Sequence, residues 1–374
     1  MKISVLTLQN ISNYGSVLQA FATKLFFESM GYRTEFVDYW RENMIDRNIA
    51  HELILHKNLK LKNVWGKTAL TRNIAERLLT NQIEKQAAPF RSFVSEKLSV
   101  SSTRYTSVEQ LNSDPPEADV YCVGSDQVWN SEWNGGFDKC FFLSYAKSGK
   151  PKLAFSSSFG VDRLPEDEGE KVKALLSDFD AVTVREESAV SLLKGLGIKS
   201  ECILDPTLLV SREVWLEQTD AKIAEKQPYI LVYQLNRSAE FDAIVNSAAE
   251  KYGKRVVRIE YRESDSEGEH IILPSVTEWI SYFRYADYVI TDSFHGTAFS
   301  LLFQRQFVDF LPDKYSGRIN SILRLLGLEE RRIETPDGVA VLEKEIDYGR
   351  VAAALEREAE KAKNIFSKVM KKYE

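Results

Sequence analysis

The sequence predicts an α/β protein built from two Rossmann-like domains that face each other across a cleft, with a helical segment inserted in the first. Three observations support this prediction. The chain has 374 residues, which exceeds one typical hydrophobic core and suits two domains. Strand-like and helix-like segments alternate in two successive series, separated by a polar, charged linker around 210–228. Hydrophobic residues make up 44% of the chain, which is ordinary for a folded protein.

The first series starts with a β-rich segment at 3–8, a polar turn, and a helix whose apolar residues recur at helical spacing up to Gly31. A strand at 34–37 completes the start of a βαβ unit. Residues 41–100 are rich in Arg, Lys and Asn and helical in propensity, which predicts an inserted helical segment or lid. The other predicted elements are strands at 119–123, 153–157, 181–184 and 201–204 and helices at 166–177 and 186–196.

The second series begins with a strand at 229–233. It continues with a helix at 239–252, a strand at 255–259, a helix at 276–285 and strands at 288–291 and 307–310. From residue 345, apolar residues recur on one helix face: Val351, Leu355, Ala359, Ala362, Phe366 and Val369. The predicted domains are 1–210, 211–344 and a C-terminal helix, 345–374, that packs back on the first domain. This arrangement resembles the GT-B architecture of many glycosyltransferases.

Composition excludes several classes of function. A net charge of -6 argues against a nucleic-acid surface, so an anion site must be built from a few placed arginines. The three cysteines are dispersed without a CxxC pair, which predicts a reducing compartment and neither a disulfide framework nor a zinc site. The first eight residues are too short an apolar run for a signal peptide, and no other run approaches a spanning helix. We therefore expect a cytoplasmic protein without a membrane span, and peripheral association stays open.

The stretch 287–303 combines a buried strand, a polar turn and an apolar helix. The turn contains Thr291, Asp292, Ser293, His295 and Gly296. In open α/β sheets, ligands bind beyond the carboxyl ends of the strands, and a helix N-terminus attracts anions. We interpret the turn as an anion site in which His295 is a general acid–base or a phosphate ligand. The alternative is a histidine that is hydrogen-bonded in the core.

Two turns of the first domain have polar residues suited to a sugar. The turn at 10–15 leads into a helix with Gln19, and its alternative reading is an ordinary βα loop with a left-handed Asn13. In the segment 121–130, Asp126 is suited to accept a proton from a hydroxyl, and Trp129 offers a flat face to a ring. The alternative makes Ser125 or Asp126 a helix N-cap and Trp129 a core residue.

Two cationic positions follow other strands. Arg185 stands at the end of the strand at 181–184, and its guanidinium has the fork geometry for carboxylate or phosphate. The alternative is an ion pair of Arg185 with Glu186 or Asp205. Lys314 and Arg318 flank a glycine near the end of a later strand, where a solvated loop is the alternative.

These segments resemble the polysaccharide pyruvyl transferase family in type and order, over residues 1–330. The resemblance is carried by Asn13-Tyr-Gly15 with Gln19, Gly124-Ser-Asp-Gln-Val-Trp-Asn130, Val184-Arg-Glu186, Asp205-Pro206 and Asp292-Ser-Phe-His-Gly296. It implies a GT-B fold and transfer of pyruvate from phosphoenolpyruvate to a sugar, commonly as a cyclic ketal across two hydroxyls. Some relatives have an arginine where this chain has Ser293, and Arg318 or Lys314 would then replace it.

The resemblance implies the following site. The donor side comprises Arg185, Ser293, His295, Gly296, Arg318 and Lys314, and the acceptor side comprises Asn13, Tyr14, Gly15, Gln19, Gly124, Ser125, Asp126, Gln127, Trp129 and Asn130. His295, Asp126 and Arg185 are the expected catalytic residues, with Arg185 and His295 projecting from opposite domains into a positively lined gap. We expect no metal and no cofactor other than phosphoenolpyruvate, the donor substrate.

The expected reaction is a pyruvyl transfer to a saccharide of a cell-surface glycan or of its lipid- or nucleotide-linked precursor. Which residue is the acid and which the base stays open. Two alternatives stay open as well. One is a GT-B glycosyltransferase that uses a nucleotide sugar, and the other is a non-catalytic protein of the same fold that binds a glycan or an anion.

Overall fold

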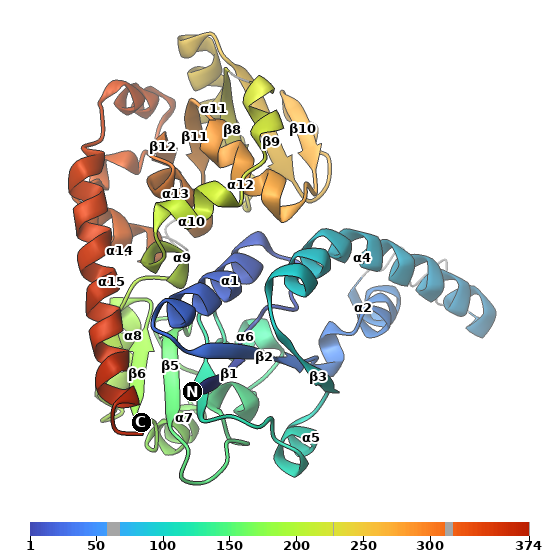
Figure 1. The fold of residues 1–374 in the computed structure, drawn as a ribbon. Coiled ribbons are helices and arrows are strands. Elements are labelled where there is room, and N and C mark those ends of the chain that lie inside the picture. The colour runs from blue at the N-terminus through green and yellow to red at the C-terminus, as the bar shows by residue number, and fades with distance from the viewer. Residues whose placement is uncertain (58–67, 227, 311–316, 374) are drawn as a thin grey trace. The chain divides into compact units, whose positions relative to one another are not determined.

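The computed structural model describes residues 1–57, 68–226, 228–310 and 317–373 (Figure 1). The chain forms two compact units. The first contains Met1–Thr183, Ser191–Glu201 and Tyr373, and the second contains Val184–Val190 and Cys202–Lys372. Residues 184–190 and 202–210, which the sequence placed with the first domain, thus group with the second unit.

The first sheet has seven strands in the order β3-β2-β1-β4-β5-β6-β7. The strands are β1 (Lys2–Leu6), β2 (Arg33–Tyr39), β3 (Val100–Tyr105), β4 (Val120–Val123), β5 (Lys152–Ser157), β6 (Ala181–Val184) and β7 (Glu201–Cys202). The pairs that β1 forms with β2 and β4 are both parallel. Strand order reverses between β1 and β4, and such a switch point is where open α/β sheets bind ligands.

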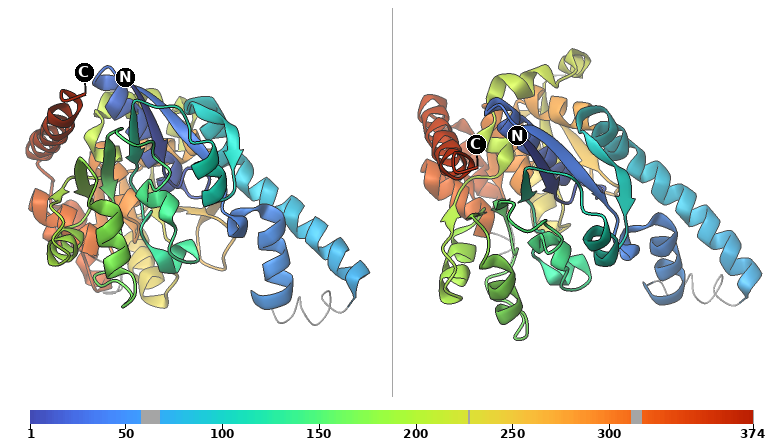
Figure 2. Two further views of the ribbon diagram at one scale, coloured as in Figure 1. Left: turned by 90° about the horizontal axis from the view of Figure 1, so that it is seen from below. Right: turned by 60° about the horizontal axis from the view of Figure 1, so that its bottom comes forward.

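The helices of this part cover the sheet and form an arm. They are α1 (Tyr14–Ser29), α2 (Asp46–Glu52), α4 (Ala69–Lys97), α5 (Val108–Ser113), α6 (Ser131–Asn134), α7 (Gly169–Leu176) and α8 (Glu187–Gly195), with short turns η1 (Glu42–Met44), η2 (Leu53–Lys57) and η3 (Lys139–Phe142). The start of α8, up to Val190, groups with the second unit. The last part of α4 packs on α1, where the rings of Phe90 and Tyr14 lie 4.8 Å apart between centroids. The first part of α4 extends from the sheet beside α2 (Figure 2). This is the helical insertion predicted over 41–100.

The second sheet has five parallel strands in the order β10-β9-β8-β11-β12. They are β8 (Tyr229–Tyr233), β9 (Arg255–Glu260), β10 (Glu269–Ile272), β11 (Tyr288–Thr291) and β12 (Gln306–Asp309). Here the order reverses between β8 and β11, which makes a second switch point. One face of the sheet buries an apolar cluster that includes Ile230, Ile244 and Ile290.

The helices of the second unit are α9 (Pro206–Leu209), α10 (Arg212–Glu217), α11 (Ala239–Tyr252), α12 (Val276–Tyr285), α13 (Phe294–Leu302), α14 (Gly317–Leu326) and α15 (Tyr348–Met370), with 3-10 turns η4 (Ala221–Lys226), η6 (Glu329–Arg331) and η7 (Pro336–Glu343). The helix α15 has the amphipathic character predicted for the C-terminus, and its contacts include α9 and α14.

The predicted fold class, α/β with two Rossmann-like parts and a helical insertion, is confirmed. The predicted facing of two domains across a cleft and the packing of the last helix on the first domain stay predictions. The elements that the sequence analysis did not predict include the edge strands β3 and β10 and the helices α5 and α14. Within the described ranges, every helix is too short or too polar to cross a membrane.

Candidate functional site

The turn after β11 is shaped by close packing around Thr291. The hydroxyl of Thr291 donates to the carbonyl of Tyr233 over 2.6 Å and accepts from the N–H of Ser293 over 3.1 Å. Ser293 caps α13, because its Oγ accepts from the N–H of Gly296 over 3.4 Å. A Cβ at Gly296 would lie 2.2 Å from Thr291 Oγ1, so only glycine lets the helix start this close to the strand.

The side chain of Asp292 links the segments that follow β8 and β11 by hydrogen bonds. Its carboxylate accepts the backbone N–H groups of Leu235 and Asn236, each over 2.6 Å. Burial raises the pKa of Asp292, against these hydrogen bonds, which lower it. The carboxylate therefore fixes the loop after β8 to the turn that carries His295.

A buried carboxylate joins the two residues that the sequence predicted as donor ligands. Arg185 Nη1 donates to Asp205 Oδ2 over 2.8 Å, and His295 Nε2 lies 3.8 Å from the same oxygen. The side chains of Arg185 and Asp205 are 1% and 0% exposed, and that of His295 is 11% exposed. Burial alone would raise the pKa of Asp205, but the charges of His295 and Arg185 outweigh it and lower the pKa. The Asp205 carboxylate thus joins Arg185 and His295 in one buried cluster.

This arrangement corrects one expectation and supports one alternative. Arg185 and His295 were expected to project from opposite domains, but both belong to the second unit. The reason is that residues 184–190 leave the first sheet at the end of β6 and group with the second unit. The alternative that the sequence analysis named for Arg185, an ion pair with Asp205, is present.

Two arginine side chains lie near the ring of Phe294, the first residue of α13. The guanidinium carbon of Arg185 lies 5.4 Å from the centroid of its ring, and that of Arg318 lies 5.9 Å from it. The His295 ring meets Phe294 edge to face at 5.3 Å. A cation over an aromatic face is attracted by its quadrupole. Arg185, Asp205, Phe294, His295 and Arg318 are called the α13 cluster below; Lys314 lies outside the described residues.

Asp309 is a second buried carboxyl beside α13. It ends β12, is 0% exposed, and accepts the Thr297 hydroxyl over 2.8 Å through Oδ1. Its Oδ2 has no hydrogen-bond partner within the described part of the chain. Burial and, to a lesser degree, the charge of Asp292 raise the pKa of Asp309 well above its usual range. Burial therefore favours the protonated, neutral form of this carboxyl.

Replacing Asp309 with asparagine tests that charge state. Because the folded-state pKa of Asp309 is raised above the unfolded value near 3.9, its contribution to stability is fully present below about pH 4 and is lost as pH rises toward the folded pKa. An asparagine side chain does not titrate, so we expect the free energy of unfolding of Asp309→Asn, relative to the native chain, to rise by about 1.4 kcal/mol per pH unit in that window. Urea unfolding at several pH values measures it. A difference that is constant with pH would mean that Asp309 is not perturbed.

The first unit has a polar site at its own switch point. Asp126, after β4, accepts the Ser16 hydroxyl of α1 over 2.5 Å and the N–H of Gln127 over 2.8 Å. Its φ is +78°, a left-handed conformation that is rare for residues other than Gly, Asn and Asp. Strained backbone of this kind is common at functional sites. The two turns predicted to face an acceptor are thus joined by a hydrogen bond between side chains.

Close packing beneath Asp126 explains Gly124 and Gln19. A Cβ at Gly124 would lie 2.8 Å from Thr7 Cβ, so the strand end requires glycine. The Thr7 hydroxyl donates to the carbonyl of Ser125 over 2.8 Å and accepts from Gln19 Nε2 over 3.0 Å. Asn13 is not left-handed: it is extended and caps α1 by accepting the N–H of Ser16.

Several predicted acceptor residues lie in the protein core instead. Trp129 is 3% exposed, stacks on Phe142 at 5.5 Å and donates through Nε1 to the carbonyl of Phe141. This corresponds to the core alternative, and a buried ring offers no face to a sugar. Tyr14 is 0% exposed, with Gly15 buried beside it, and Asn130 caps α6 while binding Gln127. The exposed part of this site is centred on Asp126.

Sequence reasoning missed Ser16, Asp309 and the role of Phe294. Ser16 lay inside the predicted turn–helix segment, but its spacing gave no signal that it meets Asp126, which is 110 positions away. Asp309 lies in the apolar segment 307–310, where the sequence predicts a strand and no pattern marks a site residue. The role of Phe294 could not be read from the sequence, because Arg185 and Arg318, which lie near its ring, are distant from it along the chain.

Comparisons with known proteins agree with this architecture. The Anabaena protein Alr3699/HepE, solved in complex with UDP-glucose, matches with a TM-score of 0.55 at 8% identity, covering 100% of this chain and 99% of that chain. The same protein in complex with UDP matches with a TM-score of 0.52 at 8% identity and the same coverage. At such low identity the likeness shows the fold alone. A search of curated protein sequences gave no match.

The family comparison is more specific. The model of the polysaccharide pyruvyl transferase family matches residues 13–312, which is most of the chain. The matched range begins at the Asn13 cap and includes Arg185, Asp205 and His295 of the α13 cluster. By its sequence, this chain therefore belongs to the polysaccharide pyruvyl transferase family.

Proposed function

We propose that the protein transfers the pyruvyl group of phosphoenolpyruvate to two hydroxyls of a saccharide, forming a cyclic ketal in the synthesis of a cell-surface polysaccharide. The observation that carries the proposal is the α13 cluster, in which a buried carboxylate pairs with both a guanidinium and an imidazole at a helix N-terminus. Family membership supports the reaction class. We place the reaction in the cytoplasm, in line with the three free cysteines.

The donor is an anion with a phosphate and a carboxylate. The N-terminus of α13 favours negative charge, and Arg318 brings a guanidinium to its first residue. We assign Arg318 and the start of α13 to the donor anion. In this proposal Arg185 acts through Asp205, because their ion pair fixes the carboxylate that faces His295.

His295 is assigned the role of general acid. The Asp205 carboxylate lies 3.8 Å from Nε2, so a carboxylate faces the nitrogen that we assign to proton transfer. Asp126, with the Ser16 hydroxyl on one oxygen, is assigned as the base for an acceptor hydroxyl. These assignments complete the acid and base roles that the sequence left open.

The proposed pyruvyl transfer begins with protonation of the donor. A proton from His295 adds to the methylene carbon of the donor, and C2 becomes an oxocarbenium-like centre. The first acceptor hydroxyl gives its proton to Asp126 and bonds to C2. The bond from C2 to the phosphate oxygen then breaks, and phosphate leaves with its electron pair. The second hydroxyl bonds to C2 and gives its proton to His295, while the proton on Asp126 passes to the phosphate. The products are the ketal and inorganic phosphate, and both residues return to their starting forms.

Donor and acceptor assays test the function. Phosphate release from phosphoenolpyruvate that requires a saccharide acceptor, together with a pyruvyl mass on the acceptor in mass spectrometry, is the expected result. Release of a nucleoside diphosphate from a nucleotide sugar would instead support the glycosyltransferase alternative. Saturable binding of a glycan or an anion without turnover for any pair would support the non-catalytic alternative.

Asp126→Asn tests the proposed base. Asparagine tolerates the left-handed φ of +78° and can still accept the Ser16 hydroxyl, so the fold should not change. We expect kcat to fall by about 10²- to 10⁴-fold, because the amide cannot take a proton, while the affinity for phosphoenolpyruvate is retained. The matched control is Ser16→Ala, which keeps the carboxylate and should cost less. Turnover equal to that of the native chain would remove Asp126 from catalysis.

A further inference from the structure

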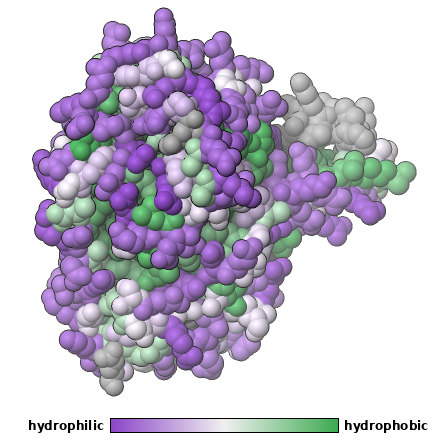
Figure 3. All heavy atoms as spheres, turned by 45° about the horizontal axis from the view of Figure 1, so that its top comes forward, coloured by the Kyte–Doolittle hydropathy of each residue, from purple (hydrophilic) through white to green (hydrophobic). Residues whose placement is uncertain are grey.

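The arm made by α2 and the first part of α4 has an exposed apolar strip. Leu70, Ile74 and Leu78 are 72%, 47% and 59% exposed, although aliphatic side chains of this size are usually buried. Their spacing of four residues places them on one face of the helix, in one row. Figure 3 shows apolar side chains at the far end of the arm. The last part of α4 packs on α1, whereas this row is left open to solvent by the described part of the chain.

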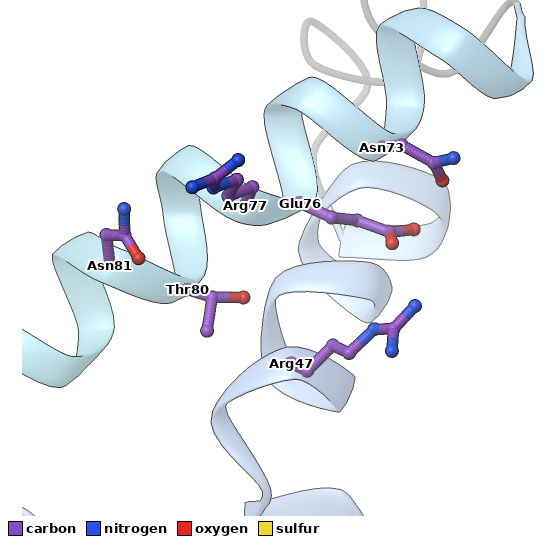
Figure 4. A pocket seen from close by; sticks show the side chains of 6 residues that line it. All are labelled: Arg47, Asn73, Glu76, Arg77, Thr80 and Asn81. Atoms are coloured by element: carbon purple, nitrogen blue, oxygen red, sulfur yellow. The ribbon is translucent and has the colours of Figure 1, made fainter.

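A polar row runs beside the apolar strip. Asn73, Arg77 and Asn81 each follow a strip residue by three positions and so neighbour it on the helix surface. They border a cavity of about 270 Å³ between α4 and α2. Arg47 projects into this cavity from α2, opposite the side chains of α4 (Figure 4). An apolar row flanked by exposed Arg47 and Arg77 thus forms one continuous surface.

The sequence around the arm contains more basic than acidic residues. Two of its three acidic groups are paired: Glu76 Oε1 lies 2.6 Å from His51 Nδ1, and Asp46 Oδ1 lies 2.7 Å from Arg91 Nη2. The third, Glu52, is partly exposed at the end of α2. In sequence, residues 46–80 contain seven Lys or Arg and three Asp or Glu, within a chain of net charge -6. This stretch is therefore net basic, although the chain as a whole is net acidic.

We propose that the α2–α4 arm docks on an anionic phospholipid surface, with Leu70, Ile74 and Leu78 in the headgroup boundary and Arg47 and Arg77 against phosphate groups. An amphipathic helix with an apolar row and flanking arginines binds membranes in this way, and negative headgroups attract the basic charge. A second copy of this chain is a poorer fit. The strip is one residue wide, whereas a stable protein interface uses roughly 20–30 residues on each side.

Vesicle sedimentation of the full chain tests the proposal without any substrate, so its outcome is independent of the proposed reaction. The probes are vesicles of phosphatidylcholine alone and of phosphatidylcholine with phosphatidylglycerol. We expect binding to the anionic vesicles, weakened by salt, and little binding to the neutral ones. Leu70→Ser with Leu78→Ser should weaken binding about tenfold or more, because both apolar contacts with the headgroup boundary are lost.

A matched control uses exposed apolar residues elsewhere. Ile272 and Leu325 are 41% and 45% exposed on β10 and α14, and replacing both with serine should leave vesicle binding unchanged. Equal loss in the two double variants, or no binding of the native chain to anionic vesicles, would overturn the proposal. So would a native dimer that the arm variant converts to a monomer with unchanged vesicle binding, since the strip would then be an interface between copies.

Discussion

Replacing His295 with glutamine is expected to lower kcat by about 10²- to 10⁴-fold. Glutamine fills a similar volume and can donate a hydrogen bond toward Asp205, but it cannot carry a proton to the methylene carbon of the donor. The loss should therefore appear in kcat, with a smaller change in the affinity for phosphoenolpyruvate. Acceptor-dependent release of phosphate measures the rate, and urea unfolding shows whether the variant is folded.

A second histidine of the same unit is the control. His270 is also largely buried and lies 2.7 Å from a carboxylate, that of Glu260, but it stands on the edge strand β10, away from α13. His270→Gln should retain full turnover. If His295→Gln is as active as His270→Gln, His295 is not the acid. If it unfolds at a much lower urea concentration than His270→Gln, the core-histidine alternative is supported.

Replacing Arg185 with alanine is expected to destabilise the second unit by about 3–5 kcal/mol. The guanidinium is 1% exposed and pairs with a carboxylate that is 0% exposed, so its removal leaves a buried negative charge beside His295. Breaking one side of a buried pair costs more than the pair itself contributes, because the remaining charge has lost its solvent and its partner. The shift of the urea midpoint at constant slope measures the loss.

Arg258 gives the matched comparison. Its side chain is also 1% exposed, but its partner Asp242 is 37% exposed and can be solvated when the arginine is lost. Arg258→Ala should therefore be less destabilising than Arg185→Ala. If Arg185→Ala keeps native stability and loses only its affinity for phosphoenolpyruvate, Arg185 is a direct donor ligand, as the sequence analysis predicted, and not a residue that acts through Asp205.

Much of the fold was predictable because the residues of its core elements have the intrinsic propensity for the strand or helix that they form. The strands β6, β8 and β11 are short apolar runs rich in β-branched and aromatic residues, and their bounds match the prediction. The helix α12 begins at a capping box of Ser275 and Glu278, and its bounds match as well.

The missed strands differ in a physical way. Residues 100–105 of β3 are largely polar, and residues 269–272 of β10 alternate weakly, because both strands lie at sheet edges where one or more sides face water. Such segments have little hydrophobic periodicity, which is the main signal for a strand in a sequence. β3 and β10 form as strands because they pair with the neighbouring strands β2 and β9.

The sequence predicted the turns that carry the site residues, but not the contacts between those residues. Strand-to-helix turns with Gly124 and Gly296 marked both switch points, because close approach there requires glycine. An ion pair of Arg185 with Asp205 was one of the alternatives that the sequence left open, but no local pattern indicated that Asp205 would also lie beside His295. The orientation of Trp129 was undecidable for the same reason, since an aromatic residue after a strand can face either solvent or core.

The route of the backbone limits how this protein can be divided. It passes from one unit to the other between residues 183 and 184, 190 and 191, 201 and 202, and 372 and 373. A fragment that stops at residue 210 would contain Arg185 and Asp205 without most of the unit to which they belong. Neither half is thus a self-contained module for separate expression, and a chimera with a relative must exchange the short stretch 184–190 along with the later sheet.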